Sequence, residues 1–166
     1  GLNHGPLRFG SSTSSTQTLN LRALEDSKIM SKVEKLENEP SALFNDPAIA
    51  QAWGLKKADA ARAWSLTKGS RQIVVAVIDT GVDINHEDLK KSFWKNPGET
   101  GTDSNGRNKE TNGIDDDGNG FVDDVHGWNF VSNNHNLNDN HGHGTHITGI
   151  ISAEANNGKG IVGIAP

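Results

Sequence analysis

The sequence predicts an α/β protein with a mostly parallel sheet, and three segments carry that prediction. Residues 73–78, IVVAVI, form an unbroken, largely β-branched apolar run, which is the pattern of a strand covered on both faces. An alanine-rich helical pattern, ADAARAWSL, precedes this run at 58–66. A second helical pattern, HGTHITGIISAEANN at 143–157, follows it after a long polar excursion. Helix, buried strand, long loop and helix in this order are typical of an α/β fold.

The N-terminal part of the chain differs in texture from the rest. Residues 1–20 are polar and rich in Ser, Thr and Gly, which predicts a flexible arm. Apolar residues recur at helix-like intervals over 21–39, and Pro40 follows as a stop, which predicts an amphipathic helix. We therefore divide the chain into an N-terminal extension, residues 1–44, and a main domain, residues 45–166.

The composition excludes several classes of function. The chain has 166 residues and a net charge of -5, so nucleic acids and anionic membranes are not expected partners. It has no cysteine, which excludes disulfides and thiolate metal sites. No apolar run approaches the roughly 18 residues of a membrane span. Because the sequence begins with Gly1 rather than Met, we expect a processed or trimmed chain from which any export signal has been removed. The expected location is secreted or extracellular, the periplasm included.

Asp79 ends the predicted buried strand and begins the sequence Asp-Thr-Gly. Catalytic groups of open parallel sheets lie beyond the carboxyl ends of strands, which is where Asp79 is expected. Three roles are open for it: a carboxylate of an aspartic protease, the orienting acid of a serine-protease triad, or a helix cap. Aspartic proteases need two such carboxylates that share a proton, so one Asp-Thr-Gly per chain would require a homodimer. A cap alone would leave the histidines downstream unexplained.

Three histidines lie together in NHGHGTHITG, namely His141, His143 and His146. Their spacing is compatible with zinc, but Thr145 stands where hydrolases with such a cluster usually place an Asp. They are also compatible with a purely structural role. Asp79 and a histidine that begins a helix would together supply two of the three members of a nucleophilic triad. A seryl hydroxyl needs an imidazole to take its proton, and the imidazole needs a carboxylate to set its tautomer.

The acidic stretch DDDGNGFVDD at 115–124 is the third feature with chemical meaning. Its oxygen-bearing side chains alternate as in the calcium loop of an EF-hand, with Gly120 at the sharp turn. The predicted ligands are Asp115, Asp117, Asn119, the Phe121 carbonyl and Asp123. Position 12 of such a loop is His126 rather than the bidentate Glu, so the full EF-hand is not present. Alternating oxygen ligands still favour Ca²⁺ over zinc. The alternative is a solvated acidic turn.

Several blocks of the sequence carry a family resemblance. VIDTGVDINHEDL and HGTHITG resemble the catalytic-Asp and catalytic-His blocks of the subtilases, the subtilisin-like serine peptidases. NDPAIAQAWGL and NNGKGIVGIAP resemble the start of the mature domain in thermitase-like members and the loop after the histidine helix. The resemblance covers residues 45–166 and implies a three-layer α/β fold, a mostly parallel sheet flanked by helices, that is incomplete in this chain. It also implies that Asp79 is the triad acid and His143 the general base of a serine endopeptidase acting on proteins or peptides.

The same resemblance implies a second calcium site and a role for the N-terminal extension. In the family, a calcium ion is held by an N-terminal side chain, an acid shortly after the triad Asp, and the loop after the histidine helix. The matching groups here are Asp46, Asp88, Asn157 and the carbonyls of Lys159 and Ile161. Residues 1–44 resemble an uncleaved extension or the remnant of an inhibitory propeptide, which would make the protein a zymogen.

The serine of the triad is not recognisable among the 166 residues. In the family it lies in a later Gly-Thr-Ser block, and neither Ser65 nor Ser92 sits in a glycine-flanked turn before a helix. Half a sheet with an open edge is also only marginally stable. We therefore expect a companion C-terminal fragment of the same protease to supply the serine. The alternative is a non-catalytic calcium-binding module or pseudo-enzyme on the same scaffold.

Overall fold

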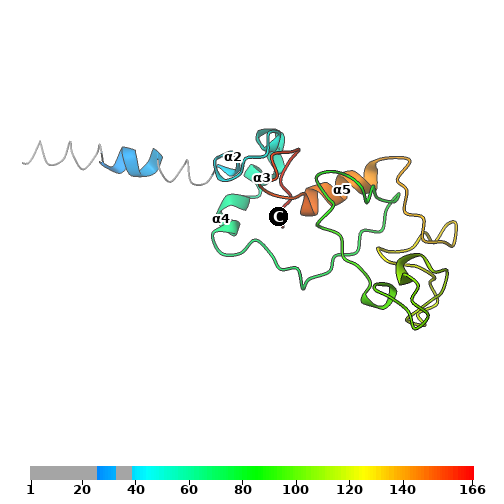
Figure 1. Cartoon of the computed structure of the whole chain (residues 1–166). Coiled ribbons are helices and arrows are strands. Elements are labelled where there is room, and N and C mark those ends of the chain that lie inside the picture. The colour runs from blue at the N-terminus through cyan, green and yellow to red at the C-terminus, as the bar shows by residue number, and fades with distance from the viewer. Residues whose placement is uncertain (1–25, 33–38) are drawn as a thin grey trace, which may run out of the picture. The chain divides into compact units, whose positions relative to one another are not determined.

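The computed structural model describes residues 26–32 and 39–166. The chain divides into two compact units, Gly1–Asn38 and Glu39–Pro166. In the first unit, residues 26–32 are helical and their side chains are exposed, in agreement with the helix predicted over this part of the sequence (Figure 1). The predicted flexible arm at 1–20 lies outside the described residues, as does most of the rest of the predicted helix.

The second unit begins with a corner of four short helices. They are α2 (Pro40–Leu43), the 3-10 helix η1 (Ile49–Gln51), α3 (Trp53–Lys57) and α4 (Ala60–Trp64). The helix predicted at 58–66 therefore forms as α4, where three of five residues are alanine, the best helix former. The buried side chains of this corner make a small hydrophobic core together with one residue from the end of the chain: Phe44, Ile49, Leu55, Ala60, Ala61, Trp64 and Val162.

Trp64 joins this corner to the last residues of the chain. Its ring packs edge-on against Phe44, with 5.0 Å between the ring centroids and an interplanar angle of 89°. Its indole Nε1–H donates a hydrogen bond to the carbonyl oxygen of Ile164 at 2.9 Å. The C-terminal segment, red in Figure 1, lies against the corner because this bond and the burial of Val162 hold it there.

Replacing Trp64 by Phe should lower the free energy of unfolding by about 1 to 2 kcal/mol, since it keeps most of the ring but removes the donor to Ile164. Urea titration monitored by circular dichroism measures the change. Trp53→Phe is the matched control, because Trp53 is 73% exposed, and it should leave the midpoint unchanged. Equal midpoints for the two variants would contradict the prediction.

The strand predicted at 73–78 does not form within the described residues. The segment carries no strand hydrogen bonds, and its side chains are exposed, with Ile73 at 72% and Ile78 at 95%. A parallel strand obtains its backbone hydrogen bonds from neighbouring strands. No described segment runs beside this one as a neighbouring strand, so the apolar run stays uncovered.

The long polar excursion after Asp79 is held together by turns rather than by a sheet. Among the described residues it contains the 3-10 helices η2 (Pro97–Glu99) and η3 (Lys109–Thr111) and the isolated antiparallel bridges Thr102↔Asn108 and Asn129↔Asn134. Side chains of Asn and Asp accept hydrogen bonds from backbone N–H groups two residues ahead at many of these turns, for example Asn108 from Glu110. Such local bonds explain how an asparagine- and aspartate-rich loop keeps one conformation.

The helix predicted at 143–157 forms as α5 (His143–Ser152) and is shorter than predicted. It ends because Ala153 adopts an extended conformation, with φ -56° and ψ 137°. The chain then turns back, and Gly163 N donates to Ala153 O at 3.0 Å. Figure 1 shows α5 in orange with the green segment after Asp79 running beside it, and Glu154 N donates to Asp88 O at 2.9 Å between the two.

The helices of the described residues are short. Over residues 26–32 and 39–166, none of them combines the length and the apolar character that crossing a bilayer demands.

Candidate active site

Asp79 and His143 meet where the extended segment 73–78 ends and α5 begins. The Nδ1 atom of His143 lies 2.8 Å from both carboxylate oxygens of Asp79. The backbone N–H of Thr80 donates to Asp79 Oδ1 at 2.7 Å and holds the carboxylate from the other side. The two residues that the sequence singled out as acid and base are therefore in direct hydrogen-bond contact.

The contact determines the proton arrangement of the pair. An ionised carboxylate only accepts hydrogen bonds, so Nδ1 carries the hydrogen and Nε2 is left with a free lone pair. The hydrogen bond from His143, followed by that from Thr80 N–H, lowers the pKa of Asp79 below its usual value of 3.8. The Asp79 side chain is 17% exposed and that of His143 is 54% exposed. Nε2 is thus the ring nitrogen of His143 that can accept a proton.

Glycines allow the loop after Asp79 to lie this close to α5 and to the segment around Leu137. A Cβ atom at Gly144, next to His143 in α5, would overlap the carbonyl oxygen of Gly81 and lie 3.3 Å from the Asp79 Cβ. Gly81 has φ +117°, and a Cβ there would lie 2.5 Å from the Leu137 carbonyl oxygen. The glycine of His-Gly-Thr-His is therefore a requirement of the contact between loop and helix.

The remaining histidines of the motif do not join the pair in a metal site. The ring of His141 packs edge-on to that of His143, with centroids 6.2 Å apart, and His146 is exposed. The cluster of possible metal ligands found among the described residues contains carboxylates and no histidine. The geometry gives the zinc interpretation no support.

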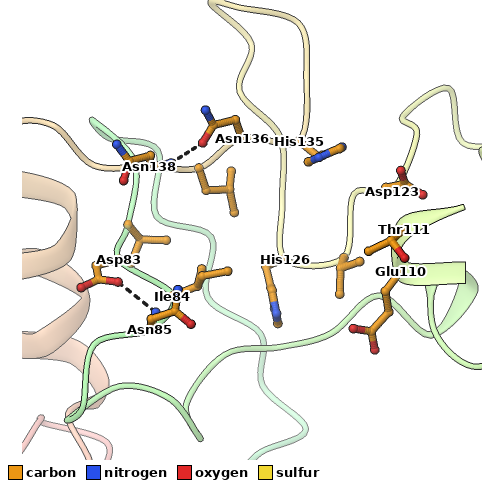
Figure 2. A pocket seen from close by; sticks show the side chains of 13 residues that line it. Asp83, Ile84, Asn85, Glu110, Thr111, Asp123, His126, His135, Asn136 and Asn138 are labelled. Carbon is orange, nitrogen blue, oxygen red and sulfur yellow. Dashed lines mark hydrogen bonds between the residues drawn. The ribbon is translucent and has the colours of Figure 1, made fainter. Parts of the chain in front are cut away.

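A pocket of about 630 Å³ is lined in part by the loop that follows Asp79. Its walls are residues 82–85, 110–111, 123–126 and 135–138, apart from Asp124. Figure 2 shows His126 between the wall of Ile84 and Asn85 and the wall of Glu110. Neither Asp79 nor His143 contributes to its lining.

The acidic loop gathers three carboxylates, but not the predicted set. Single oxygen atoms of Glu99, Asp117 and Asp124 all lie within 4.8 Å of one another. Asn96 Nδ2 donates to Asp117 Oδ2 at 2.9 Å and to Asp124 Oδ1 at 2.8 Å. Glu99 is 0% exposed, and its Oε1 accepts a hydrogen bond from Asp116 N at 2.7 Å while its Oε2 is buried without a partner. Burial raises the pKa of Glu99.

Of the ligands predicted in this loop, Asp117 alone belongs to the three-carboxylate cluster. The Asp115 carboxylate is turned into its own loop, where it accepts from the N–H groups of Gly118, Asn119 and Gly120. The amide of Asn119 donates to Asp117 and Asp124 and so lies beside the cluster. Phe121 packs its ring against Trp128, with centroids 5.0 Å apart.

Asp123, another predicted ligand, does not belong to the three-carboxylate cluster. It has a positive φ of 53°, and both of its carboxylate oxygens accept a hydrogen bond from Gly113 N. The Asp123 carboxylate is therefore engaged by Gly113, whereas the neighbouring Asp124 is a member of the three-carboxylate cluster. The EF-hand template could have indicated Asp124 by allowing a shift of one residue, whereas Glu99 lies far upstream and has no local signal in the sequence.

The residues of this cluster fit a hard cation. A buried carboxylate oxygen without a partner is costly, and three carboxylates this close repel one another unless a positive charge lies between them. Carboxylate oxygens are also the ligands that Ca²⁺ takes.

The second predicted metal set converges on the loop after α5. Asp46 and Asp88 are buried, at 2% and 3% exposed. Asp46 accepts hydrogen bonds from the N–H groups of Asn156 and Asn157, and Asp88 accepts from Asn157 Nδ2 at 2.7 Å and from Ile161 N at 3.0 Å. Lys159 directs its ammonium group to Glu87, 3.0 Å away, so its charge leaves the site. Two buried carboxylates that share the neighbouring residue Asn157 again suit a hard cation.

Comparison with known proteins decides the family. The model of the subtilase family, peptidase family S8, matches residues 70–166, which include both Asp79 and His143. The chain belongs to the subtilase family.

Three relatives of this subtilase chain illustrate the match. Subtilisin-like protease 1 of Plasmodium berghei is 39% identical over 142 residues, which cover 84% of this chain and 22% of the relative. Subtilisin-like protease 1 of Plasmodium vivax is 45% identical over 129 residues, 73% of this chain and 18% of the relative. Thermitase of Thermoactinomyces vulgaris is 32% identical over 123 residues, 74% of this chain and 33% of the relative.

The subtilase chain thus spans a third or less of the length of these curated relatives. Its matched residues include the segments that carry the acid, the base and the acidic loop.

The lowered pKa of Asp79 predicts how its contribution to stability varies with pH. A carboxyl group whose folded pKa lies below its unfolded value stabilises the protein above the unfolded pKa, and loses this effect as the pH falls through the folded pKa. The difference in unfolding free energy between the wild type and Asp79→Asn should therefore shrink steadily below about pH 4. Denaturant titrations at a series of pH values between about 5 and 2.5 measure it, and parallel curves would contradict it.

Proposed function

We propose that this subtilase chain supplies the acid and the base of a serine endopeptidase triad. The observation that carries the proposal is the contact of 2.8 Å between His143 Nδ1 and the Asp79 carboxylate. Asp79 holds the imidazole in the tautomer that leaves Nε2 free. His143 then takes the proton of a seryl hydroxyl as this attacks the peptide carbonyl, and returns it to the leaving amine. Asp79 stabilises the imidazolium formed between these two steps.

The nucleophile in this proposal is a serine on a segment outside the 166 residues, supplied by the C-terminal part of the same protease. The exposed apolar run at 73–78 supports this. A run of Ile and Val covered on both faces suits the interior of a parallel sheet, so we expect it to become a strand of the three-layer, subtilisin-like α/β fold when the neighbouring strands are present. The side chains of Ile73 and Ile78 would then be buried.

Substrates of the proposed enzyme are proteins or peptides, and the expected location is secreted, extracellular or periplasmic. The names of the relatives, which describe proteases, support the substrate class. Residues 1–44, as an uncleaved extension or propeptide remnant, would keep the protein a zymogen until they are removed. Within this range, α2 and Phe44 pack in the second unit, so residues 1–38 are the part that lies outside that unit.

Calcium is the proposed stabilising ion at two places. Glu99, Asp117 and Asp124 would hold one ion, with their charges neutralised by it. Asp46, Asp88 and Asn157 would hold the other, with the carbonyls of Lys159 and Ile161. The chemistry that Ca²⁺ supplies when bound is electrostatic and structural. Both sets tie together segments that are distant in the sequence, so a bound ion would stabilise the loops on either side of the catalytic pair.

A serine-directed fluorophosphonate probe tests the proposed function on the complete protease. Covalent labelling should occur in the wild type and be lost in His143→Ala, because the serine is not activated without its base. His146→Ala is the matched control, since His146 is exposed and lies in the same helix, and it should label normally. Absence of labelling in the folded, calcium-loaded wild type would instead favour a non-catalytic calcium-binding module.

A further inference from the structure

One carboxylate next to the catalytic pair is more heavily hydrogen-bonded than the pair itself. Asp139 accepts five hydrogen bonds, from the Thr80 hydroxyl, the backbone N–H groups of His141 and Gly142, and both the N–H and the hydroxyl of Thr145. These bonds are 2.7 to 3.1 Å long. They hold the pKa of Asp139 far below its usual value, the Thr145 hydroxyl first among them. The carboxylate is therefore ionised at any pH at which a protease of this kind would work.

The partners of Asp139 belong to the two segments that carry the catalytic residues. Thr80 follows Asp79 directly, and its hydroxyl oxygen also accepts a hydrogen bond from Gly144 N, next to His143, at 3.0 Å. Thr145 lies in the first turn of α5, and its hydroxyl oxygen accepts from Asp83 N at 3.0 Å. Each threonine hydroxyl thus donates to Asp139 and accepts from the opposite segment, which links the loop of residues 79–83 to the start of α5.

The start of α5 depends on this carboxylate for its hydrogen bonds. The N-cap residue, Gly142, has no side chain that can accept from the first N–H groups of the helix. Those groups need acceptors from elsewhere, and a negative charge at a helix N-terminus is favourable. Asp139 accepts the hydrogen bond of Thr145 N, and the Thr80 hydroxyl oxygen accepts that of Gly144 N. Both N–H groups belong to the two residues that directly follow His143.

We propose that Asp139 is a positioning residue for the triad, which sets the separation of Asp79 and His143 by clamping the loop of residues 79–83 to the first turn of α5. The inference rests on the proposed function, because it assigns Asp139 a part in the same reaction. Asp139 acts through Thr80 and Thr145 and not on the substrate. An Asn at this position would turn one acceptor into a donor that faces a hydroxyl or N–H hydrogen, so the clamp would open on one side.

Asp139→Asn in the complete protease tests the proposal in two ways. A displacement of about 1 Å between catalytic groups can cost on the order of 100-fold, so kcat should fall by about 10- to 100-fold while KM stays within a few-fold. Asp103→Asn is the matched control, because Asp103 also accepts backbone N–H groups in its own loop, at Asn105 and Arg107, away from the pair. It should leave kcat unchanged.

A second readout does not depend on peptide cleavage. The Nδ1–H proton of His143, hydrogen-bonded to Asp79, should give a low-field proton NMR resonance that is assigned by its loss in His143→Ala. In Asp139→Asn this resonance should broaden or move to higher field, and in Asp103→Asn it should stay. A variant that melts at a lower temperature but keeps both its kcat and the resonance would show that Asp139 serves stability alone, and would overturn the proposal.

Thr80 variants keep the test decisive if Asp139→Asn does not fold. Thr80→Val removes only the hydroxyl that joins the carboxylate to the loop of residues 79–83, so it should lower kcat and disturb the resonance in the same way, whereas Thr80→Ser should preserve both. An unchanged resonance in Thr80→Val would overturn the clamp. A wild type that has the resonance but no peptidase activity would contradict the proposed function. In that case the effect of the variants on the resonance alone would test whether Asp139 clamps the two segments.

Discussion

Replacing Asp79 by Asn in the complete protease should lower kcat by about 10⁴ and leave KM within a few-fold. The amide of Asn donates a hydrogen bond where the carboxylate accepted one. It therefore favours the tautomer in which Nδ1 is unprotonated and Nε2 carries the hydrogen, and an imidazole in that state cannot take the seryl proton. The shape of the side chain is nearly unchanged, so substrate binding should be preserved. Steady-state kinetics on a peptide substrate, with the enzyme concentration determined by active-site titration, measures both constants.

The matched control for this prediction is Asp83→Asn. Asp83 lies in the same loop and is exposed, and its carboxylate accepts a hydrogen bond from Asn85 N at 2.9 Å. Its replacement should change kcat by no more than a few-fold. If Asp79→Asn retained kcat within tenfold of the wild type, Asp79 would not be the orienting acid, and the contact with His143 would have only a structural role.

Removal of calcium should lower the melting temperature by about 5 to 10 °C. A ligand present at 100 times its dissociation constant stabilises the folded state by about 2.7 kcal/mol, and each kcal/mol corresponds to about 2 to 4 °C for a domain of this size. Differential scanning calorimetry with and without excess EDTA measures the change. An unchanged melting curve would count against both proposed calcium sites.

Glu99→Gln should distinguish the proposed acidic-loop site from the proposed site at Asp46 and Asp88. Its difference in stability from the wild type should change sign when calcium is added. Without calcium the variant should be at least as stable as the wild type, because it removes a buried charge with an unpartnered oxygen and places an amide donor near Asp117 and Asp124. With calcium it should be less stable, because a ligand is lost. Its melting temperature should therefore fall less on chelation than that of the wild type.

Glu110→Gln is the control for this comparison. Glu110 is half-buried near the same loop and pairs with Lys95 at 3.0 Å, outside the three-carboxylate cluster. The control should show the same loss on chelation as the wild type. Equal losses in Glu99→Gln and the wild type would exclude Glu99 as a calcium ligand.

The contact between Asp79 and His143, the proposed acid and base, could be predicted from the sequence because the signals of both residues are local. Asp79 follows an apolar run directly, and His143 is flanked by glycines at the start of a helical pattern. Each signal is contained in a few consecutive residues, so no knowledge of distant contacts is needed. The helices at 60–64 and 143–152 were predictable for the same reason, with errors at their ends, where caps and turns decide the last residues.

The signal for the proposed cation site in the acidic loop is also local, whereas the membership of the three-carboxylate cluster is not. Alternating oxygen-bearing side chains favour a hard cation. Asp123, however, has a positive φ and accepts hydrogen bonds from Gly113 N, while Asp124 belongs to the three-carboxylate cluster. Glu99 reaches the cluster from η2, a different part of the chain. A periodic template cannot anticipate either fact.

The sequence by itself determined the family, and it indicated the acid and base of the proposed triad and the general place of the proposed cation sites, because these depend on residue types at short, regular spacings. Only the tertiary structure decided that Glu99 and Asp124 join Asp117, that Asp139 bridges the two catalytic segments, and that the apolar run at 73–78 is uncovered in this part of the protein. Those features depend on which distant segments share their hydrogen bonds and bury each other's surface. Packing in three dimensions decides which segments do so, and a pattern of neighbouring residues does not indicate it.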